Sequence, residues 1–131
     1  MIRVLLAEDD PAHATLTEFA FREVAPPGEP IEVRTVADGR DVVAALDGAP
    51  PDLVVLDVRL PGASGFDVLA AIRSTPGWQA TPVIMLSMSD REEDRSRAAA
   101  LGANDYVVKP IGFDALEALL RGVLTQWVGR R

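Results

Sequence analysis

The strongest constraint in this sequence is a set of short apolar runs, each of which ends abruptly at polar or charged residues. Four of these runs lie at residues 3–7, 53–56, 83–86 and 106–108. They show no regular alternation of apolar and polar residues, which is typical of strands that are covered on both faces in a parallel sheet. A fifth run, at residues 31–36, does alternate and is therefore predicted to be an edge strand.

Helical patterns fill the intervals between these runs. Most are preceded by Asp or Ser, which are favoured N-caps, and most are followed by Gly or Pro. The predicted helices begin at Asp10 or Pro11, Asp38, Ser64, Asp90 and Phe113. The first four are ended by Pro26-Pro27-Gly28, Gly48, Pro76-Gly77 and Gly102, and the last runs to about Trp127. In the first helix one face is shared by Leu16, Phe19, Ala20 and Val24. Strand and helix alternate five times, which predicts an α/β fold with a doubly wound parallel sheet.

Composition limits the function classes. The chain has 131 residues, a formal charge of −7 and no cysteine. Its length is typical of one domain and allows one hydrophobic core. The lack of cysteine excludes disulfides and thiol-based sites, and the acidic charge disfavours nucleic acid and anionic membranes as partners. No apolar run approaches the roughly 20 residues of a membrane span, and no signal peptide is visible. We expect one cytoplasmic domain, residues 1–131, with no membrane or nucleic-acid partner.

The residues that follow the strands carry the chemistry, because ligands of doubly wound sheets bind beyond the carboxyl ends of the strands. The predicted strands end at Glu8 and Asp9, at Asp57, at Ser87 and at Lys109. Three carboxylates, a hydroxyl and an ammonium are therefore expected at one edge of the sheet. Each alone would be an ordinary turn residue, but their joint occurrence favours a functional site.

Clustered carboxylates repel one another unless a cation neutralises them. Hard oxygen ligands suit Mg²⁺, whose coordination shell is completed by water and a substrate phosphate. Lys109 could pair with one oxygen of a transferred phosphoryl group, and the Ser87 hydroxyl could bind another. Carboxylates are known phosphoryl acceptors, and Asp57 on the central strand is the natural one here. The sequence thus predicts phosphoryl transfer to Asp57 with Mg²⁺.

The whole chain resembles the receiver domains of bacterial two-component response regulators. The resemblance lies in residues 5–10, residues 51–57 with Leu60-Pro61-Gly62 and Gly65, residues 82–87 and residues 102–110. It implies a five-stranded sheet in the flavodoxin-like order 2-1-3-4-5 with five helices. It also implies a signalling protein that catalyses only its own phosphorylation and dephosphorylation. With only a last helix after residue 110, we expect a stand-alone regulator that lacks an output domain.

The resemblance assigns the acceptor and the metal ligands. Asp57 would take the phosphoryl group from a phosphohistidine of a sensor histidine kinase. Asp9 and Asp57 would ligate Mg²⁺ directly, the backbone carbonyl of Arg59 would be a third ligand, and Glu8 would act through water.

The resemblance also assigns the residues around the phosphoryl group. Ser87 would bind this group and Lys109 would pair with it. Tyr106 would be an aromatic switch whose ring turns inward as Ser87 moves. Pro110 would follow a cis peptide bond. Output would then pass through a phosphorylation-dependent protein-protein surface.

More narrowly, the chain resembles single-domain receivers associated with bacterial phytochromes, which would make the kinase a bacteriophytochrome. The matching features are residues 16–21, the loop of residues 25–30, Ser89-Asp90 with Glu93-Asp94, Ala103-Asn104 and Trp127. The last helix carries an apolar stripe that is wider than one core face requires: Phe113, Leu116, Leu119, Leu120, Val123, Leu124, Trp127 and Val128. An exposed remainder of this stripe would bind a partner, so we expect a homodimer through the C-terminal helix.

Two residues near the site have competing interpretations. Met88 follows the switch serine, where the family usually has a small residue. It either covers the phosphorylation site or fills a gap in the packing. His13, in the first turn of a helix, is expected to be a surface residue rather than a phosphorelay group.

Other function classes fit less well. A phosphatase of the haloacid-dehalogenase type needs a second Asp two residues after its nucleophile, where this chain has Arg59. A flavodoxin-type carrier needs a phosphate-binding loop after the first strand, where Glu8 and Asp9 would repel a bare phosphate. A degenerate receiver that acts as a phosphorylation-independent binding module remains the alternative, although the complete acidic set, Ser87 and Lys109 argue against it.

Overall fold

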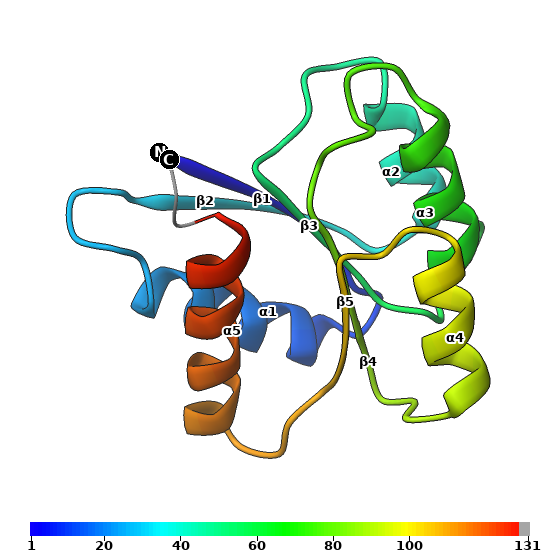
Figure 1. The fold of residues 1–131 in the computed structure, drawn as a ribbon. Coiled ribbons are helices and arrows are strands. Elements are labelled where there is room, and N and C mark those ends of the chain that lie inside the picture. The colour runs from blue at the N-terminus through cyan, green and yellow to red at the C-terminus, as the bar shows by residue number, and fades with distance from the viewer. Residues whose placement is uncertain (129–131) are drawn as a thin grey trace.

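The computed structural model describes residues 1–128, in which strands and helices alternate along the chain (Figure 1). The strands are β1 (Ile2–Ala7), β2 (Ile31–Val36), β3 (Leu53–Leu56), β4 (Val83–Ser87) and β5 (Asp105–Val108). The helices are α1 (Pro11–Glu23), α2 (Gly39–Ala45), α3 (Gly65–Ser74), α4 (Glu92–Ala100) and α5 (Phe113–Trp127). Within this part of the chain, no helix is long and apolar enough to cross a membrane.

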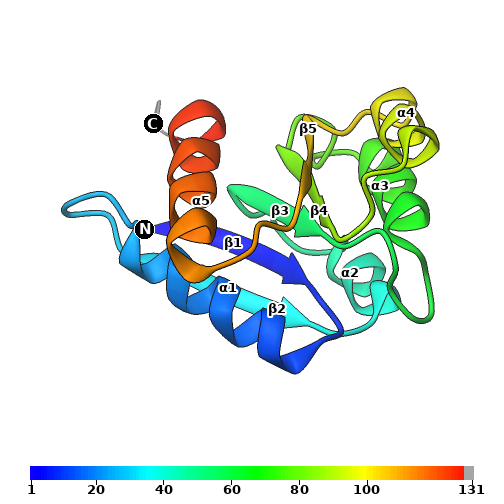
Figure 2. The same ribbon diagram turned by 90° about the horizontal axis from the view of Figure 1, so that it is seen from below.

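The described strands form a parallel sheet in the order β2-β1-β3-β4-β5. The order predicted from the sequence is thereby confirmed. Helices α1 and α5 cover one face of the sheet, and α2, α3 and α4 cover the other (Figure 1 and Figure 2). Strand β2 pairs with one edge of β1, and the chain then crosses over so that β3 pairs with the other edge of β1. This switch point places a site at the carboxyl ends of β1 and β3.

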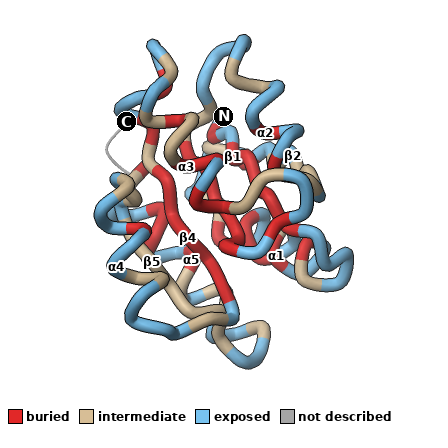
Figure 3. The backbone as a smooth tube through the Cα atoms, turned by 90° about the vertical axis from the view of Figure 1, so that its right-hand side faces the viewer, coloured by how far each residue is buried: buried red, intermediate tan, exposed pale blue. Residues whose placement is uncertain are grey.

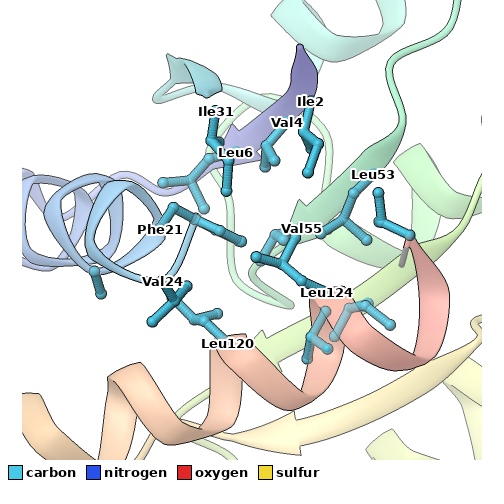
Figure 4. Close-up of a cluster of buried hydrophobic side chains, with 14 of the residues drawn as sticks. Ile2, Val4, Leu6, Phe21, Val24, Ile31, Leu53, Val55, Leu120 and Leu124 are labelled. Carbon is cyan, nitrogen blue, oxygen red and sulfur yellow. The ribbon is translucent and has the colours of Figure 1, made fainter. Parts of the chain in front are cut away.

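The core has two parts, one on each face of the sheet. Leu6 and Val55 enter the cluster under α1 and α5, while their neighbours Leu5 and Val54 enter the cluster under α2, α3 and α4. The first cluster is drawn in Figure 4. Strands β3 and β4 are buried throughout, as the tube in Figure 3 shows for β4. Covering on both faces explains why these runs contain no alternation.

The inner face of α1 differs from the prediction. Its buried residues are Ala14, Thr17, Ala20 and Phe21. Leu16 and Phe19, which were placed on one face with Ala20, are 48% and 53% exposed. With about 100° of rotation per residue, the buried face is centred on Thr17. Leu16 therefore lies about 100° from the centre of this face and Phe19 about 160° from it. The Phe19 ring packs 5.5 Å from the ring of Phe113 at the start of α5.

The apolar stripe of α5 packs within the domain. The helix buries Leu120, Val123 and Leu124. Four more apolar residues are half-buried against the same core cluster: Phe113, Leu116, Leu119 and Trp127. The large apolar side chains that are exposed in residues 1–128 are Met1, Leu16, Phe19, Val43, Met88 and Ile111. None belongs to α5, so the exposed remainder that was expected on this helix is not found there.

Helix α4 begins at Glu92, later than predicted. Its N-cap is Arg91, which makes no side-chain capping hydrogen bond, so the expected cap by Asp90 is wrong. The Ser89 hydroxyl makes two hydrogen bonds beside this end of the helix. It accepts a hydrogen bond from the Arg91 backbone N–H at 3.3 Å and donates one to Asp94 at 2.6 Å.

Candidate functional site

The carboxyl ends of four strands meet at one edge of the sheet, where the sequence predicted a site. Glu8 and Asp9 follow β1, Asp57 follows β3, Ser87 ends β4 and Lys109 follows β5. All of them line one pocket of 470 Å³. Backbone hydrogen bonds tie the strand ends together: the Asp57 N–H donates to the Ala7 carbonyl at 3.1 Å, and the Lys109 N–H donates to the Ser87 carbonyl at 2.8 Å.

Glu8, Asp9 and Asp57 form the acidic part of the pocket. One carboxylate oxygen from each lies within 4.8 Å of the others, with Glu8 and Asp57 buried and Asp9 exposed. Carboxylates this close repel one another unless a positive charge lies between them. Hard oxygen donors are also the ligands that Mg²⁺ prefers in proteins. The chemistry of the donor set therefore fits a divalent cation.

Lys109 brings a positive charge to these carboxylates. Its Nζ donates to Asp57 Oδ2 at 2.8 Å and also to Glu8 Oε1. Burial lowers the pKa of Lys109, but its hydrogen bonds to Asp57 and Glu8 and their negative charges outweigh this effect and raise the pKa above its ordinary value. Lys109 is therefore charged at neutral pH and neutralises part of the acidic cluster.

Two backbone features hold Asp57 in place. The Arg59 N–H donates to Asp57 Oδ1 at 3.1 Å, so one carboxylate oxygen is held by the backbone while the other faces Lys109. Gly65, the first residue of α3, lies against the Asp57 carbonyl. A Cβ at this position would come within 2.1 Å of the Asp57 carbonyl oxygen. The close approach of α3 to the end of β3 thus requires glycine, which has no Cβ.

The loop between β4 and α4 links Ser87 to Tyr106. Ser87 is buried, and its Oγ accepts a hydrogen bond from the Ser89 N–H at 3.3 Å. The Tyr106 hydroxyl donates to the Ser89 carbonyl at 2.7 Å. The guanidinium of Arg95 lies 5.1 Å from the centroid of the Tyr106 ring, a cation–π contact. The two residues predicted to form the switch are therefore joined by one loop residue.

The prediction of a cis peptide bond before Pro110 is wrong. No peptide bond in residues 1–128 is cis. The bond between Lys109 and Pro110 is trans, which is the lower-energy isomer for most X–Pro bonds. The Lys109 N–H still reaches the Ser87 carbonyl, so the strand end is held without the cis geometry.

His13 and Met88 are also among the residues that line the pocket. His13 has a partly exposed side chain, as expected, but its Nδ1 also lies 3.5 Å from Lys109 Nζ. This contact could not be predicted from the sequence, because the two residues are 96 positions apart. The available signal was the position of His13 in the first turn of the helix after β1. Met88 is 69% exposed at the mouth of the pocket, so it does not fill a gap in the core.

A doubly wound sheet with an acidic pocket opposite a lysine is the arrangement that the sequence predicted for a receiver domain. Residues 4–121 match the family model of the response regulator receiver domain. The chain therefore belongs to the receiver domains of two-component response regulators, and the predicted family is confirmed.

Several known proteins are similar to this chain. The transcriptional regulatory protein TcrA of Mycobacterium tuberculosis is 44% identical over 122 residues. This match covers 93% of this chain but 46% of TcrA, so the chain spans about half the length of the curated relatives it matches.

Solved structures agree over nearly the whole chain. The phosphorylated cyanobacterial phytochrome response regulator RcpA is 32% identical, with a TM-score of 0.88 over 99% of this chain and 96% of RcpA. The receiver domain of the sensor histidine kinase PA1611 from Pseudomonas aeruginosa, which has a magnesium ion coordinated in its active site cleft, is 30% identical. Its TM-score is 0.83 over 98% of each chain.

Proposed function

We propose that this receiver accepts a phosphoryl group from a sensor histidine kinase on Asp57 and that phosphorylation then changes its contacts with other proteins. The observation that carries this proposal is the meeting of Glu8, Asp9 and Asp57 with the Lys109 ammonium at one edge of the sheet. A carboxylate between a cation site and an ammonium is placed to attack phosphorus, because both positive charges neutralise the incoming phosphoryl group.

Glu8, Asp9, Asp57 and the backbone carbonyl of Arg59 would hold Mg²⁺, with Glu8 acting through water. When bound, the ion offsets the negative charge that accumulates on the carboxylates and the phosphoryl oxygens. The acidic donor set supports this assignment, as does the magnesium ion in the similar PA1611 receiver. The Arg59 N–H already binds Asp57 Oδ1, which keeps the Arg59 backbone beside the carboxylate.

The transfer itself needs little more than positioning. A carboxylate oxygen of Asp57 forms a bond to phosphorus while the phosphorus–nitrogen bond to the kinase imidazole breaks, and the electron pair of that bond returns to the nitrogen. The Lys109 ammonium, now bonded to Asp57 Oδ2, would pair with a phosphoryl oxygen. The Ser87 hydroxyl would donate to another. Water later attacks the phosphorus, the bond to the Asp57 oxygen breaks, and inorganic phosphate leaves as the carboxylate is regenerated. The receiver would thus catalyse only its own phosphorylation and dephosphorylation.

The signal would leave through Ser89 and Tyr106. If Ser87 moves toward the phosphoryl group, its hydrogen bond with the Ser89 N–H shifts the Ser89 backbone. The Tyr106 hydroxyl, which is hydrogen-bonded to the Ser89 carbonyl, then moves as well. A local change of charge thus biases a surface with two arrangements. The hydrogen bonds around Ser89 support this route.

A protein partner would reach Asp57 through the mouth of the pocket. Three exposed apolar residues, Leu16, Met88 and Ile111, line a neighbouring groove of 320 Å³ between α1 and the loop before α5. Exposed apolar groups gathered beside a polar pocket are typical of a protein-binding surface. The similarity to RcpA, named a phytochrome response regulator, supports a bacteriophytochrome as the kinase.

A homodimer through the C-terminal helix region has less support, because the apolar residues of α5 pack within the domain. Sedimentation at several concentrations, with and without phosphorylation, tests it. A monomer under all conditions contradicts it.

The central test is phosphotransfer profiling against candidate histidine kinases, with Asp57→Asn as the matched control. We expect label on the wild type and none on the variant. Label that persists on Asp57→Asn contradicts the assignment of the acceptor. A wild type that no kinase and no small phosphodonor can label favours the phosphorylation-independent binding module instead.

A further inference from the structure

The contact between His13 and Lys109 is not used by the proposed function. His13 Nδ1 lies 3.5 Å from Lys109 Nζ and 3.7 Å from Asp10 Oδ2. His13 comes from the first turn of α1, and Lys109 directly follows β5. Both line the acidic pocket and also the apolar groove beside it.

The Lys109 ammonium has three N–H donors and no acceptor. Two of its partners are Asp57 Oδ2 and Glu8 Oε1, and the third polar atom in reach is His13 Nδ1. In the proposed function, Asp57 and Glu8 also serve the metal ion and the phosphoryl group. His13 is the partner of Lys109 that binds neither the metal ion nor the phosphoryl group. The lysine ammonium lies at the end of a flexible aliphatic chain, so it needs such a partner to stay in one position.

Asp10 keeps His13 in position rather than competing for it. Asp10 Oδ1 accepts hydrogen bonds from the Ala12 and His13 backbone N–H groups at 2.9 and 3.3 Å, which fixes the start of α1. The imidazole nitrogen is nearer to Lys109 than to the Asp10 carboxylate. A contact of 3.5 Å is long for a hydrogen bond, but polar contacts in ligand-free sites often tighten only in the reacting complex.

We propose that His13 is a positioning residue for phosphoryl transfer, a role that rests on the phospho-acceptor function proposed above. Its imidazole accepts a hydrogen bond from the Lys109 ammonium at Nδ1, in the tautomer with the ring N–H at Nε2. Lys109 is thereby held over Asp57 while the carboxylates are engaged elsewhere. His13 does not itself exchange protons or phosphoryl groups.

The test measures phosphorylation of the full chain by phosphoramidate at saturating Mg²⁺. A small donor is needed because His13 also lines the apolar groove, where a substitution could disturb kinase docking. His13→Leu removes the acceptor and keeps a good helix former. We expect its maximal rate to fall about three- to tenfold, the value of one modest hydrogen bond, with the half-saturating donor concentration unchanged. His13→Asn places an amide oxygen near the position of Nδ1 and should restore most of the rate.

Two controls separate positioning from packing. Thr15→Ala, at an exposed position on the same helix, should leave the rate unchanged. In a Lys109→Met background, His13→Leu should have no further effect, because His13 acts through Lys109. Thermal unfolding of each variant shows whether the domain stays folded.

The outcomes distinguish this inference from the proposed function. Equal labelling of wild type and Asp57→Asn removes the acceptor assignment and with it the role of His13. Labelling that depends on Asp57 but not on His13→Leu overturns the positioning role alone. A rate for His13→Asn as low as that for His13→Leu overturns it too, as does a full effect of His13→Leu in the Lys109→Met background.

Discussion

The Tyr106 hydroxyl donates a hydrogen bond of 2.7 Å to the backbone carbonyl of Ser89, which lies 17 residues earlier in the chain. The N–H of the same Ser89 donates to the Oγ of Ser87. Two hydrogen bonds of Ser89 thus connect the buried Ser87 in the acidic pocket to the half-buried Tyr106. The Arg95 guanidinium packs over the tyrosine ring and helps to keep it in this orientation.

Tyr106→Phe removes only the hydroxyl, so the ring and its contact with Arg95 remain. We expect the free energy of unfolding to fall by about 0.5–1.5 kcal/mol, the net value of one intramolecular hydrogen bond. Urea denaturation measures this change. The rate of phosphorylation by a small donor should stay close to that of the wild type, because Tyr106 touches none of the three carboxylates. An unchanged free energy of unfolding would show that the hydrogen bond adds no net stability.

Mg²⁺ should stabilise the domain, because it binds the folded acidic cluster and not the unfolded chain. The gain is about 2.7 kcal/mol when free Mg²⁺ is a hundred times its dissociation constant. Asp9→Asn should raise the stability of the metal-free protein, since one repelling charge is lost, and should shrink the gain from Mg²⁺. Thermal unfolding in Mg²⁺ and in EDTA checks both effects. Asp41→Asn, an exposed acidic residue on α2, is the control of equal charge, and an identical Mg²⁺ gain in Asp9→Asn and Asp41→Asn contradicts the site.

Met88→Ala should open the mouth of the acidic pocket. The Met88 side chain is 69% exposed there, so its removal leaves no cavity in the core and stability should change little. We expect severalfold faster phosphorylation by phosphoramidate, or faster loss of the phosphoryl group, because small molecules reach Asp57 more easily. Stopped-flow and phosphate-release assays measure the two rates. Unchanged rates in both directions would show that Met88 does not restrict access.

From neutral pH upward, the pairing of Lys109 with Asp57 and Glu8 should weaken only in the alkaline range. The pKa of Lys109 is raised above its ordinary value of 10.5 in the folded protein, so this pairing stabilises the fold fully below that pH and is lost as the pH rises through the folded pKa. Compared with Lys109→Met, the wild type should lose its advantage in free energy of unfolding above pH 10.5. Urea denaturation of the metal-free proteins at pH 8 and pH 11 measures it. A difference that already disappears between pH 6 and 9 contradicts the assignment.

Some features of α1 and α4 could not be predicted from local patterns. Leu16 and Phe19 fit an apolar stripe, but the packing of Ala20, Phe21 and Val24 into the core cluster selects the side of the helix that is buried, and Leu16 and Phe19 stay exposed. Asp90 is a good capping residue by type, but α4 starts at Glu92 with Arg91 as its N-cap, and the Ser89 hydroxyl binds the Arg91 N–H and the Asp94 carboxylate beside this end. In both cases several registers satisfied the local preference, and packing against distant elements selected one.

The sequence by itself determined the order of strands and helices and the acidic residues of the site, because unbroken apolar runs, capping residues and strand ends are local properties. Because the strands are parallel, their carboxyl ends lie at the same edge of the sheet, and this places Glu8, Asp9, Asp57 and Lys109 together. Only the tertiary structure decided that His13 contacts Lys109, that Ser89 connects Ser87 to Tyr106 by hydrogen bonds, and that the apolar stripe of α5 packs against the core. The physical reason is that these contacts join residues far apart in the chain, where side-chain direction and packing depend on the whole fold.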